Sequence, residues 1–131
     1  SDQVDADLQK AAQEADEALD RYSEAYAEYL EKSRILESQL DDKDTDDALR
    51  EGLMSQLEQE ENRLKEEREA LAGSLREYYV LNNTAEDAKR IADDKVCRIE
   101  AEVAVWQDRQ RILEDILDGV DDKDIVVPDS G

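Results

Sequence analysis

Residues that break helices are almost absent from the first 118 positions of this chain. The 131 residues include four Gly and one Pro, and three of these five lie in the last 13 positions. Within a helix, Gly costs about 1 kcal/mol relative to Ala, and Pro costs about 3 kcal/mol. The sequence therefore favours long, uninterrupted helices over most of its length.

Apolar residues recur with heptad spacing in the first third of the chain. These positions are Val4, Leu8, Ala11, Ala15, Ala18, Tyr22, Ala25, Tyr29, Leu36 and Leu40. Alternating steps of three and four residues predict an amphipathic helix, here over about residues 2–40. A flanking stripe of Leu19, Tyr26, Leu30 and Ile35 widens the apolar face beyond that of a two-stranded coil, so this helix needs two neighbours.

Two further heptad stripes predict helices over about residues 46–82 and 85–118. The second stripe comprises Leu49, Leu53, Leu57, Leu64, Leu71, Leu75 and Tyr78. The third comprises Ala88, Ala92, Val96, Ile99, Val103, Trp106, Leu113 and Leu117. Asp44 or Thr45 is expected to cap the second helix, and Thr84 the third.

Helices of this length joined by short loops must pack as antiparallel neighbours. We therefore predict an all-α fold, an antiparallel up-down-up three-helix bundle of coiled-coil type over residues 1–119, followed by an acidic flexible tail over 120–131. A longer intermolecular coiled coil is the alternative architecture. The layers expected in the bundle are Ala15 with Leu71, Tyr22 with Leu64, Leu71 with Val96, Leu53 with Leu113 and Leu49 with Leu117. In this register Trp106 falls beside Ala25, close to Tyr22, Tyr26 and Tyr29, and Gln110 is a buried partner for Tyr29. We expect these aromatic residues to belong to the core, and a binding surface is the alternative.

The charge of the chain excludes several kinds of partner. Asp and Glu number 38 against 17 Lys and Arg, which gives a formal net charge of −21. Such a charge opposes direct binding to nucleic acid or to anionic lipid. A single Cys forms no internal disulfide, and no apolar run approaches the roughly 18 residues of a membrane span. We expect a cytoplasmic protein.

No pattern in the sequence points to catalysis. The chain has no His, which excludes histidine-based triads and the common zinc-protease motif, and its few Gly form no phosphate-binding loop. We therefore expect a non-enzymatic protein without cofactor or metal. Glu60 and Glu67 stand where the second heptad stripe would have apolar residues. They leave the middle of this helix weakly anchored, so it becomes a candidate face for partner contact or for homo-oligomerisation.

Two acidic segments are the other candidate partner-binding residues. Asp41, Asp42 and Asp44 recur in the same spacing as Asp121, Asp122 and Asp124. In an up-down-up bundle both copies lie at one end, where they would attract a basic surface, bind a divalent cation weakly or form solvated helix ends. Ile125, Val126 and Val127 form an apolar triplet that suits strand addition to a partner, docking in a groove, or folding back on the bundle.

The sequence is compatible with two classes of function. The first is a structural or adaptor protein that acts through helix-face contacts in a larger assembly. The second is an acidic chaperone or nucleic-acid mimic that masks the basic surface of a client, with binding that weakens steeply as salt is added. A third interpretation needs no partner, because a high content of carboxylates also suits the cytosol of a salt-loving organism.

Overall fold

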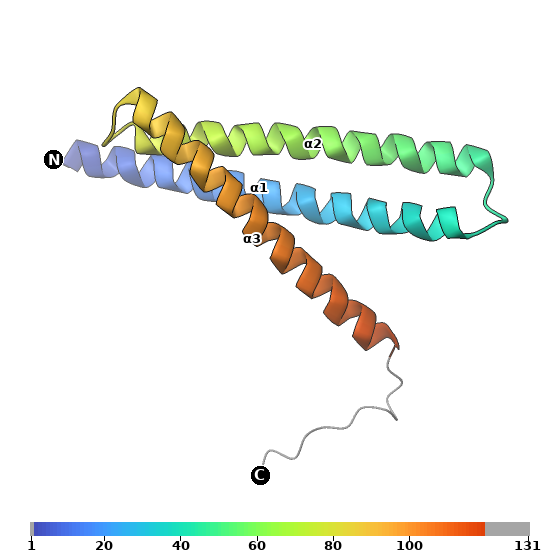
Figure 1. Cartoon of the computed structure of the whole chain (residues 1–131). Helices are drawn as coiled ribbons and strands as arrows, with labels where there is room; N and C mark the ends of the chain where they lie inside the picture. Colours follow the sequence, from blue (N-terminus) through green and yellow to red (C-terminus); the bar gives the residue numbers. More distant parts are fainter. Residues whose placement is uncertain (1, 120–131) are drawn as a thin grey trace, which may run out of the picture.

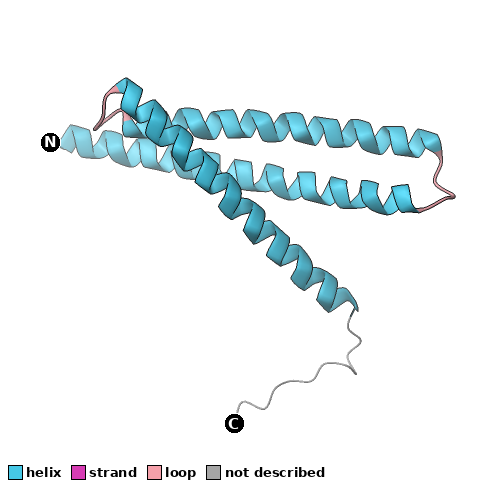
Figure 2. Cartoon of the chain, in the orientation of Figure 1, coloured by secondary structure: helices cyan, strands magenta, loops and turns pink. Residues whose placement is uncertain are grey.

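Three long helices make up the computed structural model, which describes residues 2–119. α1 (Asp2–Asp41) and α2 (Asp47–Tyr79) lie antiparallel and side by side, and α3 (Ala85–Gly119) crosses them obliquely near the N-terminus of α1 (Figure 1). Within residues 2–119 the helices are connected only by short turns, without any strand (Figure 2). The fold is the all-α three-helix bundle that the heptad pattern predicted.

The turn between α1 and α2 is capped one residue later than expected. The side chain of Asp46 accepts a hydrogen bond from the backbone N–H of Ala48 at 3.1 Å and is the N-cap of α2. The hydroxyl of Thr45 instead donates to Oε1 of Gln39 at 2.9 Å. The predicted cap at Asp44 or Thr45 is therefore wrong, because Thr45 uses its hydroxyl to tie the turn back to α1.

In the turn between α2 and α3, the start of α3 agrees with the sequence prediction, whereas the end of α2 does not. Oγ1 of Thr84 accepts a hydrogen bond from the backbone N–H of Asp87 at 3.1 Å, which confirms Thr84 as the N-cap of α3. α2 ends at Tyr79 rather than at residue 82, because Leu81 N–H bonds the Tyr78 carbonyl and Asn82 N–H bonds the Tyr79 carbonyl in tight turns.

The buried core lies at the end of the molecule where all three helices meet. It comprises Ala11, Ala15, Ala18, Tyr22, Ala25, Leu71, Ala72, Leu75, Ala88, Ala92 and Val96. Small residues of α1 and α3 allow close helix approach around the larger side chains of Leu71, Leu75 and Val96, as interdigitating layers require. Leu64 and Val103 pack against the same cluster. The layers expected at this end are therefore brought together.

The layers expected at the opposite end do not form. α3 leaves the hairpin obliquely, and Leu113 and Leu117 are 60% and 67% exposed. Their expected partners are not core residues either, since Leu49 is exposed and Leu53 is half-buried. Trp106 is 73% exposed, so its predicted core position beside Ala25 is wrong.

Candidate functional site

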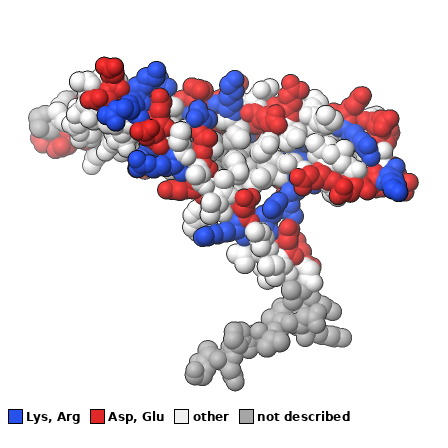
Figure 3. All heavy atoms as spheres, viewed as in Figure 1, with Lys and Arg blue, Asp and Glu red and all other residues white. Residues whose placement is uncertain are grey.

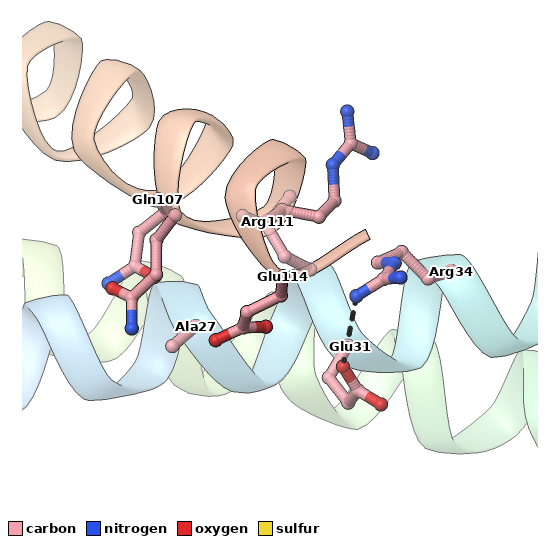
Figure 4. A pocket seen from close by; sticks show the side chains of 8 residues that line it. Ala27, Glu31, Arg34, Gln107, Arg111 and Glu114 are labelled. Carbon is pink, nitrogen blue, oxygen red and sulfur yellow. Dashed lines mark ion pairs between the residues drawn. The ribbon is translucent and has the colours of Figure 1, made fainter. Parts of the chain in front are cut away.

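Polar side chains line the contact between α1 and the last turns of α3. A cavity of about 190 Å³ separates the two helices there. Its lining residues are Ala27, Leu30, Glu31 and Arg34 of α1 with Gln107, Gln110, Arg111 and Glu114 of α3 (Figure 4). Gln110 is exposed at its edge, so the predicted role as a buried partner of Tyr29 is wrong. The two helices meet here through hydrophilic groups.

Arg34 links the two helices electrostatically across this contact. Its Nη2 lies 2.5 Å from Oδ1 of Asp115 on α3, and its Nη1 lies 3.8 Å from Oε2 of Glu31 on α1. The Arg34–Glu31 pair is drawn in Figure 4. Arg34 is one of few cations on a surface rich in carboxylates, and it holds the polar side of α3 toward α1.

Six large apolar side chains of the same α3 segment are exposed. We call them the outer α3 face, which comprises Val105, Trp106, Ile112, Leu113, Ile116 and Leu117. At about 100° per residue, Ile112 and Ile116 lie roughly 160° around the helix from Glu114, which lines the contact with α1. Trp106, Leu113 and Leu117 lie roughly 60–100° from Glu114, and Trp106 also lines a pocket with residues of α1. The outer α3 face therefore consists of one apolar stripe beside the contact with α1 and one nearly opposite it.

A second apolar stripe gives the outer α3 face its width. Val105, Ile112 and Ile116 are spaced by seven and four residues, beside the stripe that contains Trp106 and Leu117. Sequence reasoning missed these three residues, although the same test identified a flanking stripe in the first helix. A helix whose apolar arc is wider than one neighbour can cover indicates a further contact.

A tyrosine cluster marks the boundary of the core along α1. The rings of Tyr22 and Tyr26 are 6.4 Å apart, and those of Tyr26 and Tyr29 are 6.3 Å apart. Tyr22 is buried, which confirms its predicted core position, whereas Tyr26 and Tyr29 are half-buried. Burial raises the pKa of Tyr22 to about 12, with a smaller contribution from the charge of Glu100.

Ionisation of the buried Tyr22 lowers the stability of the folded protein at alkaline pH. Folding raises the pKa of Tyr22 from 10.0 to about 12, so the folded protein holds the phenol proton more tightly than the unfolded chain. This stability is fully present below about pH 10 and is lost as the pH rises to about 12, by about 2–3 kcal/mol. We expect Tyr22→Phe to flatten the decline, as measured by urea unfolding at a series of pH values. A decline of wild-type steepness in Tyr22→Phe would contradict this assignment.

The carboxylates predicted to bind a partner through α2 are engaged within the chain. Oε2 of Glu67 lies 3.2 Å from Nε of Arg21 on α1. Glu60 is half-buried, and its Oε2 is buried without a hydrogen bond, 3.9 Å from Nη1 of Arg63 one turn along α2. Arg63 also pairs with Glu28 of α1. The Arg21–Glu67 and Arg63–Glu28 pairs therefore join α1 to the middle of α2.

The acidic turn between α1 and α2 is partly used for its own structure. Oδ1 of Asp42 accepts a hydrogen bond from the backbone N–H of Asp44 at 3.0 Å, and Asp41 is the last residue of α1. Asp121, Asp122, Asp124, Ile125, Val126 and Val127 lie outside the described residues. Over the part of α3 that is described, the helix ends away from this turn (Figure 1). On the visible face, Asp and Glu are distributed along the hairpin and α3 rather than gathered at one end (Figure 3).

Residues 2–119 contain no group of three or more His, Cys, Asp or Glu side chains arranged to hold a metal ion. None of the described helices is long and apolar enough to cross a membrane. Comparison with protein-family models, with curated proteins and with solved structures gave no significant match to this chain.

Proposed function

We propose that this chain is a non-enzymatic structural or adaptor protein that joins a larger assembly through helix-face contacts. The observation that carries the proposal is the direction of the outer α3 face. In globular proteins, a large patch of exposed apolar surface often marks an interaction site. Trp is among the side chains that most often supply binding energy at the centres of interfaces, and the aliphatic residues near Trp106 add apolar area to be buried.

Closing α3 onto its own hairpin would not remove the stripe of Val105, Ile112 and Ile116 from water. Gln107 and Glu114 already face α1, and Ile112 and Ile116 lie on nearly the opposite side of the helix. Rotation of α3 that buried these isoleucines would expose Ile99 and Val103, which pack at the core. Binding of a second protein would bury the outer α3 face without this cost. Each large side chain gains about 1.5–3 kcal/mol on full burial, before the cost of association.

Affinity capture with two matched variants tests this function. Leu113→Ser with Leu117→Ser disrupts the outer α3 face, and Val80→Ser with Leu81→Ser removes exposed apolar residues elsewhere. We expect wild type and the second variant to capture the same protein from native lysate in about 0.5 M salt, and the first variant to lose it. Titration of that protein should shift the Trp106 emission to the blue as the indole becomes buried.

Two outcomes would oppose the adaptor function. Equal capture by all three proteins would remove the outer α3 face from the contact. Capture that disappears at about 0.5 M salt in wild type and both variants would instead favour the acidic chaperone, because exposed charge pairs are screened at that ionic strength.

A further inference from the structure

The hairpin has an apolar groove of its own at the end that α3 does not cover. It lies between α1 and α2 and has a volume of about 550 Å³. Leu36 of α1 and Leu57 of α2 are half-buried in it, and Met54 is 57% exposed. The groove exists because α3 leaves the hairpin before reaching these residues.

Three carboxylates border the groove along one side of α2. Glu51 and Glu58 are seven residues apart and Glu61 is three further on, so all three lie near one face of the helix with Met54. All three are exposed, and none takes part in an ion pair within residues 2–119. The seven lining residues include three Glu and neither Lys nor Arg.

Two cations at this end of the hairpin are engaged elsewhere. Nη2 of Arg50 donates to the carbonyl oxygen of Asp42 at 3.2 Å, at the turn between the helices. Arg34 pairs with Asp115 and Glu31 on the side of α1 that faces α3. Glu51 and Glu58 therefore keep a charge that a binding partner can neutralise, whereas Glu61 has Lys65 one helical turn away in a neighbouring pocket.

We propose that this groove binds a basic amphipathic helix of a partner protein. The apolar stripe of that helix packs on Leu36, Met54 and Leu57, and its Lys or Arg residues pair with the three carboxylates. A helix that binds in a groove inserts apolar residues spaced three or four positions apart along one of its faces. The flexible side chain of Met54 can adapt to the residue that enters. A second copy of this chain is disfavoured as the occupant, because each copy carries a net charge of −21.

This inference deepens the proposed function by naming the chemistry of a partner, but the groove and the outer α3 face are separate surfaces. Loss of one therefore leaves the other intact. The two proposals fail independently when each surface is altered alone.

A synthetic helix tests the groove directly. The probe is a fluorescently labelled amphipathic peptide of about 18 residues made of Leu and Lys, with a Leu and Glu peptide of the same pattern as control. Glu58→Lys with Glu61→Lys reverses the border charge, and Asp93→Lys with Asp94→Lys makes the same change in net charge on exposed α3 positions. We expect the first variant to weaken binding about tenfold or more, and the second less than about threefold.

Further variants distinguish binding in the groove from binding to the outer α3 face and from dimer formation. Met54→Ser removes an exposed apolar side chain without disturbing the core, and we expect it to weaken the peptide about threefold to tenfold. Leu113→Ser with Leu117→Ser should leave peptide affinity unchanged. Equal weakening by both charge-reversal variants, loss of binding in the α3 variant, or equal binding of the Glu peptide would overturn the proposal. A dimer in sedimentation equilibrium that Met54→Ser dissociates would assign the groove to a second copy instead.

Discussion

Replacing Tyr22 by Ala is expected to destabilise the protein by about 3–5 kcal/mol, the cost of removing a large aromatic side chain from a core. Only 3% of Tyr22 is exposed, and its ring packs among Ala18, Leu71 and Val96 in the cluster where three helices meet. The alanines around the ring already hold the helices close together. The helices therefore cannot move inward to fill the space that the ring leaves. Urea unfolding followed by circular dichroism measures the change.

Trp106→Ala provides the contrast for this experiment. Trp106 belongs to the same predicted heptad core as Tyr22, yet it is 73% exposed, so its removal should change stability by no more than about 0.5 kcal/mol. A loss of several kcal/mol in Trp106→Ala would show that α3 closes onto the hairpin along its whole length. It would also assign Trp106 to the core and leave only the stripe of Val105, Ile112 and Ile116 in the outer α3 face.

Leu71→Ala is expected to cost about 2–5 kcal/mol, through lost burial and the cavity that remains. Leu71 is 1% exposed and lies in α2, where it packs in one cluster with buried residues of α1 and α3. The rigid surroundings include Ala15 and Ala92, which have no side chain long enough to fill the cavity. Thermal or urea unfolding measures the loss.

Leu117→Ala makes the same chemical change at the uncovered end of α3. Leu117 is 67% exposed, so its truncation should alter stability by only about 0.5 kcal/mol or less. Comparable destabilisation by the two substitutions would mean that the core extends to the end of α3. That result would contradict the division of the molecule into a three-helix end and an open hairpin.

Sequence patterns were sufficient to predict the elements and the core of the three-helix end. Heptad spacing identified Tyr22, Leu71 and Val96 as buried residues, because a local repeat fixes which side of each helix is apolar. Thr84 was identified as a cap for the same reason, since capping requires only neighbouring residues. Asp46 was missed, because Thr45 had equivalent chemistry and only the fold of the turn decided between them.

Candidate binding residues were predicted less completely. Glu60 and Glu67 were identified as interruptions of an apolar stripe, but the structure shows that Arg63 and Arg21 neutralise them. The groove beside Met54 and the outer α3 face arise from where α3 diverges from the hairpin. The heptad repeat continues through that point, so the repeat carries no sign of the divergence.

The sequence by itself determined three helices, their antiparallel order and the residues of the shared core, because these depend on helix-breaking residues, periodicity and loop length. Only the tertiary structure decided which apolar residues of α3 stay uncovered. That choice depends on the angle at which α3 crosses α1 and α2, which follows from the packing of small and large side chains where the three helices meet, and the exposed Arg34–Asp115 pair is compatible with it. Side chains far apart in the sequence fix this angle together, and no local pattern encodes it.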